Sequence, residues 1–412
     1  MKQTSSPAAA ELVTSALRIA PVFDGHNDLP SALRETGYGL EGLDTGRPEL
    51  HTDIPRLRAG GVGAQFWSVF VPSSLSEPEA VVATLEQVDL VQRLVARYPE
   101  TFALACSADD VTRAIEGGRI ASLLGIEGGH SIATSLGVLR AFARLGVRYM
   151  TLTHNDNTSW ADSATDEPRV GGLNDVGRAV VAEMNRIGVL VDLSHVAATT
   201  MHAALDVVTA PVIFSHSSCR AIGTHPRNVP DDVLTRLAGN GGVIQLTFVP
   251  AFISDVVADW RAGGQVERAR LGLPVDEWTW PRAPRPGESA EAAAAEIAGQ
   301  KVIFEENPEF AGWLAEHPRP KVSLAQVADH VEHAREVAGI DQIGIGGDYD
   351  GVDVQPDDLV DVSRYPRLLI ELAERGWSET ELTALTGRNM LRVLRAAEEQ
   401  ATEPLWPTTA RP

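Results

Sequence analysis

Lysine is scarce in this sequence of 412 residues: among its 35 basic residues only three are lysines, Lys2, Lys301 and Lys321. None of the three follows a strand-like segment. Their scarcity argues against Schiff-base chemistry, against lysine-anchored cofactors, and against the carbamylated lysine that bridges two metal ions in many barrel hydrolases. If this chain binds two bridged metal ions, a glutamate or an aspartate must bridge them.

Cysteine and clustered positive charge are also lacking. Two cysteines, Cys106 and Cys219, cannot form a disulfide framework or a Cys-rich zinc knuckle, and we expect both to be buried thiols. Any metal ion is then left to histidine and carboxylate ligands. A net charge of −21 without a basic run argues against nucleic acid or an anionic membrane as partner, because phosphate binding needs clustered positive charge. A small-molecule partner is the better expectation.

Long apolar runs are absent as well. Glu11 and Arg18 interrupt the short apolar stretch of the first twenty residues, so no continuous signal-peptide core is present, and no window approaches a membrane-spanning length. With 44% hydrophobic and 22% charged residues, the composition is that of a globular protein with one large core. We therefore expect a soluble, cytoplasmic protein.

Short apolar runs do recur between helix-like stretches. Several, such as VLVDLS and PVIFS, are continuously hydrophobic, which is the pattern of parallel strands buried on both faces. The helical stretches between them carry caps such as Asn174 and Ser323. Repeated alternation of strand and helix predicts an α/β fold, a closed (β/α)8 TIM barrel forming a single domain over residues 1–412. The eight predicted strands cover residues 21–23, 62–71, 119–126, 147–153, 188–194, 211–215, 242–248 and 342–347.

A lean barrel of this kind needs about 250 residues, so the rest of the chain must elaborate it. Much of the surplus lies in residues 250–321, before the last predicted strand, where the Pro-rich WPRAPRPG precedes the helical ESAEAAAAEIAGQ. We interpret this segment as a helical insertion within the domain at the catalytic mouth, serving as lid, dimer contact or both. The segment WSETELTALTGRNMLRVL predicts a C-terminal helical hairpin, and residues 401–412 a poorly ordered tail.

The ends of the predicted strands carry histidines and acids. His26 and Asp28 close the first strand in DGHNDLP, and residues two apart on an extended segment point the same way, so both can face one cation. Glu127 follows the third strand in LLGIEGGH, where the glycines allow a tight turn. With no lysine available, Glu127 is the natural bridging ligand. Taken alone, the first pair could equally form a turn and Glu127 could cap a helix.

Two adjacent strands close in Ser-His, which is the strongest local signal: His195 ends VLVDLSH and His216 ends VIFSH. His154 ends the fourth strand in TLTHNDNTSW, and Asp348 ends the eighth in IGIGGDYDG. Barrel enzymes build their sites from the carboxyl ends of strands, so we predict that these groups share one site.

Other histidines and acids receive no ligand role. Asp192, within its strand, is expected to be buried and hydrogen-bonded, and His130 to be structural or to support a ligand. The remaining candidates lie in loop or helix patterns and are assigned no catalytic role: His51, His202, His317, His330 and His333.

Seven motifs in order resemble the membrane (renal) dipeptidase family of zinc peptidases, which belongs to the amidohydrolase-like barrels: DGHNDLP, GIEGGHSI, LTHNDNTSWADSA, VDLSH, FSHSSCRAI, RNVPDDVL and GGDYDGV. The resemblance runs from about residue 22 to 352 and through the C-terminal hairpin; it covers the 250–321 insertion less well. It implies two Zn²⁺ per chain, with His26 and Asp28 on one, His195 and His216 on the other, and Glu127 and a hydroxide bridging both.

The resemblance also implies roles for three further residues. His154 would contact the substrate carbonyl, Arg227 in RNVPDD would bind the terminal carboxylate of a dipeptide, and Asp348 would move protons. The alternatives are that Arg227 is an ordinary surface arginine and that Asp350 is the true acid. The family suggests a homodimer and an L-Xaa-D-Xaa preference, but its membrane attachment should not be transferred, since this sequence shows neither a secretion signal nor an apolar tail.

The sequence therefore predicts a zinc-dependent dipeptidase in which a metal-bridging hydroxide attacks the peptide carbonyl. A second hypothesis keeps the barrel and the metal ions but assigns the enzyme a different bond to hydrolyse, as in a lactonase, a β-lactam amidase or a deaminase. A third is a non-catalytic metal-binding scaffold.

Overall fold

A computed structural model describes residues 6–35, 37, 39–273 and 307–403 of the chain. Its sheet contains nine parallel strands, and eight of them close into a barrel because β2 pairs with β4 and β1 pairs with β9. The predicted (β/α)8 barrel is thereby confirmed. In order around it, the strands are β1 (Val22–Asn27), β2 (Val62–Phe70), β4 (Ile120–Glu127), β5 (Val147–Thr151), β6 (Leu190–Asp192), β7 (Ile213–Ser217), β8 (Val243–Leu246) and β9 (Ile343–Ile345).

The ninth strand, β3 (Phe102–Leu104), lies outside the barrel and was not predicted. It pairs only with the first residues of β4, from Ile120 to Ser122. Because it is three residues long and Leu104 is exposed, it lacks the continuous apolar run that marks the barrel strands.

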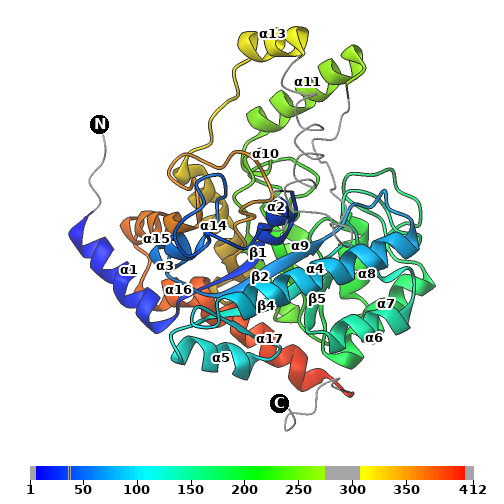
Figure 1. Cartoon of the computed structure of the whole chain (residues 1–412), viewed down its shortest axis with the longest axis horizontal. Helices are drawn as coiled ribbons and strands as arrows, with labels where there is room; N and C mark the ends of the chain where they lie inside the picture. The colour runs from blue at the N-terminus through cyan, green and yellow to red at the C-terminus, as the bar shows by residue number, and fades with distance from the viewer. Residues whose placement is uncertain (1–5, 36, 38, 274–306, 404–412) are drawn as a thin grey trace.

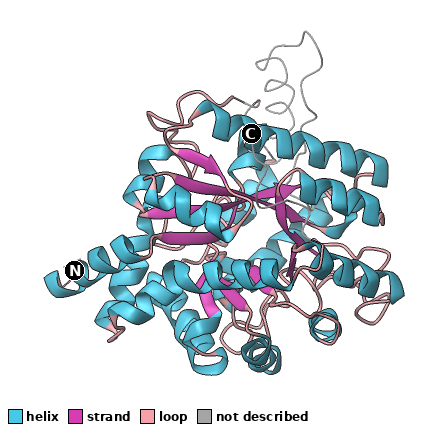
Figure 2. Cartoon of the chain, turned by 90° about the horizontal axis from the view of Figure 1, so that it is seen from below, coloured by secondary structure: helices cyan, strands magenta, loops and turns pink. Residues whose placement is uncertain are grey.

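Helices surround the strands on the outside of the barrel (Figure 2). Two predicted caps are present: Asn174 accepts hydrogen bonds from the first turn of α7, and the Ser323 side chain accepts one from the Gln326 amide at the start of α14. No helix in the described part of the chain is long and apolar enough to cross a membrane. The helices around the barrel include α1 (Pro7–Ile19), α2 (Leu29–Glu35), α3 (Ile54–Ala59), α4 (Glu77–Arg97), α5 (Ala108–Glu116), α6 (Leu136–Arg144), α7 (Asp175–Ile187), α8 (Ala198–Leu205), α9 (Asp231–Asn240) and α14 (Leu324–Ala338).

The chain between β8 and β9 is helical where it is described: α10 (Pro250–Ile253) and α11 (Asp255–Leu271) precede α13 (Pro308–Glu316). In Figure 1, α11 and α13 stand out above the barrel. The two helices pack through aromatic side chains, with ring centres of Trp260 and Trp313 6.0 Å apart. The helix predicted at ESAEAAAAEIAGQ lies outside the described residues.

The C-terminal helices close the floor of the barrel. After α15 (Tyr365–Glu374), the chain runs without a break through α16 (Glu379–Thr383), a π-helical turn (Ala384–Arg388) and α17 (Asn389–Gln400). The turn of the predicted hairpin therefore lies between α15 and α16, where the motif begins, rather than in the middle of the motif. Apolar residues of α17, such as Met390 and Leu394, pack in one cluster with the barrel interior, so the opposite, carboxyl-terminal mouth is left for a site. Both cysteines are buried free thiols, as expected.

Candidate metal centre

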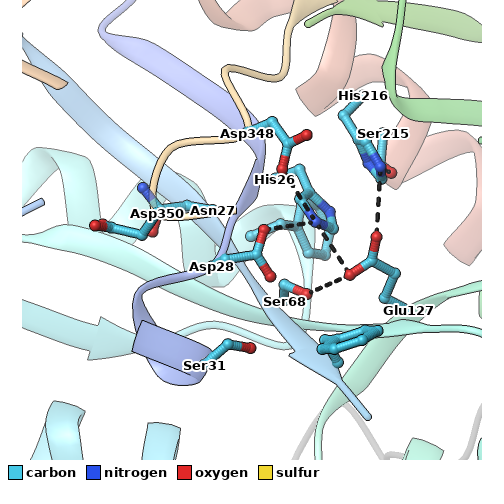
Figure 3. Close-up of polar contacts among 12 residues, drawn as sticks. His26, Asn27, Asp28, Ser31, Ser68, Glu127, Ser215, His216, Asp348 and Asp350 are labelled. Carbon is cyan, nitrogen blue, oxygen red and sulfur yellow. Dashed lines mark hydrogen bonds and ion pairs between the residues drawn. The ribbon is translucent and has the colours of Figure 1, made fainter. Parts of the chain in front are cut away.

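Glu127, the last residue of β4, lies at the centre of the predicted site. Its Oε1 is 2.9 Å from Nε2 of His195 and 3.4 Å from Nε2 of His216. Its Oε2 is 3.5 Å from Nε2 of His26 and accepts a hydrogen bond from Oγ of Ser68 at 3.0 Å (Figure 3). The two carboxylate oxygens of Glu127 thus face different histidines, Oε2 toward His26 and Oε1 toward His195 and His216.

Asp28 and Asp348 complete the side of the site that holds His26. Oδ2 of Asp28 is 3.2 Å from Nε2 of His26, and Oδ1 of Asp348 is 4.0 Å from the same nitrogen. Gly351 lies directly against both carboxylates: a Cβ added there would be 2.4 Å from Oδ1 of Asp348 and 2.5 Å from Oδ2 of Asp28. A glycine is therefore required at this position for the two acids to keep their places.

Asp350, the alternative acid, does not share this site. Figure 3 shows it on the far side of Asn27, away from His26. Its Oδ1 accepts a hydrogen bond from the backbone N–H of His51 at 2.6 Å, and it does not line the cavity at the barrel mouth. The geometry therefore favours Asp348.

The donor atoms fit metal ions. Nε2 of His26 is buried and has no hydrogen-bond partner, an arrangement that costs free energy unless a cation takes up its lone pair. Nitrogen and carboxylate oxygen donors of this kind suit zinc. Three sets of donors have atoms within 4.8 Å of one another: His26, Glu127 and His216; Glu127, His154 and His195; and His26, Asp28 and Asp348.

The electrostatics of the site favour a positive charge at its centre. Burial lowers the pKa of His26, but Tyr149, Glu127 and Asp28 outweigh burial and raise that pKa well above its ordinary value. Burial and then Asp28 and Glu127 raise the pKa of Asp348, although His26 opposes them. Burial holds the pKa of His195 and of His216 well below the ordinary range, so both are neutral imidazoles, which is the form that binds metal ions.

His154 and Arg227 lie at the rim of this cluster. Nε2 of His154 is 3.8 Å from Oε1 of Glu127, and its ring packs against Phe70 with centres 4.7 Å apart. Burial lowers the pKa of His154 to about 4. Arg227 is only 1% exposed, so it is not an ordinary surface arginine.

Arg227 has few strong contacts within the protein. Its Nη2 donates to the His216 carbonyl at 3.4 Å, its Nη1 to Oγ of Ser217 at 3.5 Å, and its guanidinium carbon lies 5.1 Å from the ring centre of Phe252. Its Nε is buried without a partner. Burial lowers the pKa of Arg227 to about 10, which still leaves the group charged at neutral pH. A buried, charged and weakly engaged guanidinium is suited to bind an anion.

A cavity of about 900 Å³ opens above the cluster. Its floor includes Glu127, His195 and His216, with Asp28, His154, Arg227 and Asp348 beside them. One wall comes from the loop after β5, with Asp156 and Asp166, and another from α11, with Asp259 and Arg261. Part of the predicted insertion therefore lines the mouth.

Several residues of the site were not identified from the sequence. Ser68 on β2 holds Glu127, Tyr149 on β5 lies 2.8 Å from Nδ1 of His26, and His225 lines the cavity. Gly125 could have pointed to Tyr149, because a glycine inside an apolar strand often marks a close approach. A Cβ there would lie 2.0 Å from the Tyr149 ring.

The histidines assigned no catalytic role lie away from the cluster, and none of the five lines the cavity. His130 is held by the Val71 carbonyl, 2.8 Å from its Nε2, which is a structural contact. His330 is buried on α14, where its Nδ1 accepts from the Cys219 amide.

Comparison with known proteins gives one family. The sequence model of the membrane dipeptidases, peptidase family M19, matches residues 11–406. An uncharacterized dipeptidase of Schizosaccharomyces pombe is 42% identical over 395 residues, which cover 92% of this chain and 81% of the relative. Dipeptidase 3 of Mus musculus is 37% identical over 406 residues, covering 96% of this chain and 68% of the relative.

Solved structures share the fold. A probable dipeptidase from Pseudomonas aeruginosa has a TM-score of 0.77 at 22% identity, covering 96% of this chain and all (100%) of that one. A metallopeptidase from Rhodobacter sphaeroides, solved with a phosphinate mimic of the dipeptide L-Ala-D-Ala, has a TM-score of 0.72 at 21% identity, covering 92% and 99%. At these identities the likeness concerns the fold alone.

Proposed function

This chain belongs to the membrane dipeptidase family, peptidase family M19, and is therefore a metallo-dipeptidase; from that premise we propose that it hydrolyses dipeptides with two zinc ions per chain. Family membership also decides against a non-catalytic scaffold. The proposed zinc ligands are His26, Asp28, Glu127, His195 and His216.

The placement of Glu127 carries the proposal. Its Oε2 faces His26, beside Asp28, while its Oε1 faces His195 and His216. A carboxylate with one oxygen toward each of two ligand groups is the arrangement that bridges two metal ions, and Lys321, the lysine in the described part of the chain, is exposed and pairs with Asp357 instead. When bound, the two zinc ions would supply an activated water as nucleophile and would polarise the substrate carbonyl.

The surrounding residues orient the substrate and move protons. Arg227 binds the terminal carboxylate through its planar guanidinium, which fixes the length of the substrate. His154, between Phe70 and the cluster, donates a hydrogen bond to the carbonyl oxygen as negative charge develops there. Asp348, next to Asp28 at the cavity, takes a proton from the attacking water and passes it to the departing amine.

We further propose that the chain accepts L-Xaa-D-Xaa dipeptides. A metallopeptidase of the same fold from Rhodobacter sphaeroides was solved with a phosphinate mimic of L-Ala-D-Ala, and the cavity of about 900 Å³ leaves room for either configuration at the second residue. The homodimer and the cytoplasmic location stay predictions from the sequence.

A panel of dipeptides tests the proposal. Purified full-length protein, stripped of metal and reloaded with Zn²⁺, is assayed for amine release from matched L,L and L,D dipeptides. We expect turnover of several L,D members, loss of turnover on metal removal, and close to two zinc ions per chain. Failure to cleave any member of the panel, or a lactone or β-lactam cleaved while every dipeptide is not, would overturn it.

A further inference from the structure

Behind His216 lies a fully buried carboxylate that the proposed function does not use. Asp192 is the last residue of β6 and has no solvent exposure. Its Oδ1 accepts hydrogen bonds from the backbone N–H groups of Ser215 at 2.8 Å and Ser194 at 3.1 Å. Its Oδ2 accepts from the hydroxyls of Ser215 at 2.7 Å and of Thr151. An aspartate with four donors around it is held as an acceptor.

Ser215 connects this carboxylate to His216. A serine hydroxyl has one hydrogen, and three atoms are placed to accept it: Oδ2 of Asp192 at 2.7 Å, Nδ1 of His216 at 2.8 Å and Oγ of Ser194 at 3.4 Å. The carboxylate oxygen is the nearest of the three and belongs to an acid held as an acceptor by its other donors, so it takes the hydrogen. Oγ of Ser215 is then an acceptor toward Nδ1 of His216, 2.8 Å away, so Nδ1 must carry the imidazole proton. Figure 3 shows Ser215 beside His216 at the end of β7.

This hydrogen-bond order leaves Nε2 of His216 with a free lone pair. Nε2 is the nitrogen that lies 3.4 Å from Glu127 and 2.9 Å from Nε2 of His195, inside the proposed zinc site. We propose that Asp192 and Ser215 are positioning residues that fix the tautomer and the ring orientation of His216 for zinc binding. The inference rests on the proposed function, because it assigns the carboxylate and the hydroxyl a task only if His216 is a ligand.

The other two imidazoles are supported differently. Nδ1 of His26 lies 2.8 Å from the neutral phenol of Tyr149, and Nδ1 of His195 is buried with no hydrogen-bond partner. Of the three, only His216 has a support that ends on a carboxylate. A carboxylate behind a ligating histidine raises the basicity of the ligand and orients the ring, and here the effect passes through one hydroxyl.

The substitution D192N reverses the hydrogen-bond order with little change of shape. The amide oxygen stays with the two backbone donors, so the NH₂ group faces Ser215 and donates to its Oγ. The hydroxyl hydrogen of Ser215 then turns to Nδ1 of His216, which moves the imidazole proton to Nε2, where the zinc ligand is needed. S215A is milder, because it removes the acceptor for Nδ1–H without forcing the other tautomer.

T151V is the matched control. Thr151 donates to the same oxygen of Asp192 but does not contact His216 through a hydrogen bond. It therefore tests whether any loss of a hydrogen bond at this carboxylate disturbs the site. Thermal unfolding of the metal-free proteins shows whether each variant has kept its fold.

Metal-free full-length protein is titrated with Zn²⁺ against a chromophoric chelator, and bound zinc is counted by elemental analysis. For one of the two zinc ions, we expect D192N to weaken binding by about 10- to 100-fold and S215A by about 10-fold, and T151V to stay within about 3-fold of the wild type. Folded D192N with two zinc ions at wild-type affinity would overturn the inference, as would equal losses in T151V and D192N. If the wild type itself binds no zinc, the proposed function fails instead.

Discussion

Replacing Arg227 by methionine should remove recognition of the substrate carboxylate and leave the fold intact. Methionine can pack against Phe252, over whose ring the guanidinium now lies, and the hydrogen bonds lost to His216 and Ser217 are long, at 3.4 and 3.5 Å. The substitution also removes a charge whose pKa burial has lowered to about 10, so stability should not fall. A substrate carboxylate loses two charge-assisted hydrogen bonds, together about 3–4 kcal/mol. That corresponds to a fall in kcat/KM of roughly 10²- to 10³-fold.

The assay compares dipeptides with their C-terminal amides. In the wild type, the free acids should be cleaved far faster than the amides. In R227M the two cleavage rates should become similar, because only the free acids have a carboxylate that can bind to Arg227. R220M is the control, since Arg220 lies on the same loop, donates to the Pro226 carbonyl and does not line the cavity. If zinc-loaded R227M cleaves free dipeptides within about 3-fold of the wild type, the carboxylate is not bound by Arg227.

Three further substitutions test the site and its frame. G351A places a methyl group 2.4 Å from Oδ1 of Asp348 and 2.5 Å from the nearer oxygen of Asp28. The zinc content should therefore fall, and kcat/KM should fall by about 10-fold or more. An unchanged zinc content would contradict this role of Gly351. Y149F removes the hydroxyl 2.8 Å from Nδ1 of His26 and should weaken the binding of one zinc ion by about 10-fold in a chelator competition. Equal zinc affinities of Y149F and the wild type would refute this prediction. E183Q tests a pH effect. Hydrogen bonds from Arg186, then those from Arg140, lower the Glu183 pKa from 4.5 to about 2. The ionised Glu183 therefore stabilises the folded protein above pH 4.5, and this contribution is lost as the pH falls toward 2. In urea unfolding, the free energy of unfolding of the wild type should exceed that of E183Q by about 1–3 kcal/mol at pH 7, and by less at pH 3.5. The same difference at the two pH values would contradict the prediction.

The barrel could be predicted because its strands are buried on both faces. Residues such as Leu190 and Val191 on β6 and Ile213 and Phe214 on β7 are fully or almost fully buried, and continuous apolar runs of this kind are rare elsewhere. A search for continuous apolar runs misses β3, because this short strand pairs with β4 along one side only and its other edge is exposed. Apolar runs also do not predict that α16, the π-helical turn and α17 follow one another as one continuous helical segment. Gly387 permits a close approach to the barrel there, since a Cβ would lie 2.7 Å from the Pro21 carbonyl, and a glycine in sequence does not distinguish that role from a helix end.

Ligand candidates could be identified because histidines and acids are conspicuous at strand ends, but the residues that orient them could not. Tyr149, Ser215 and Asp192 are buried residues of the barrel strands, where a phenol, a hydroxyl or an acid is commonly a satisfied core group. Their roles follow from the pairing of β6 with β7 and from the direction of each side chain. The pairing register and the rotamers are properties of the folded barrel, which no single run of residues contains.

Backbone geometry explains why His195 and Asp348 reach the site although each lies three residues beyond its strand. Both have left-handed backbone, with φ of 68° and 58°, and such residues cost about 1–3 kcal/mol each unless their surroundings hold them. The turn directs each side chain back over the barrel axis, toward Glu127 and His26. Histidine and aspartate tolerate this region better than most residues, so neither position requires a glycine. The strain at these two positions is concentrated on side chains that face the cavity, as expected where a fold retains a costly conformation for the sake of a site.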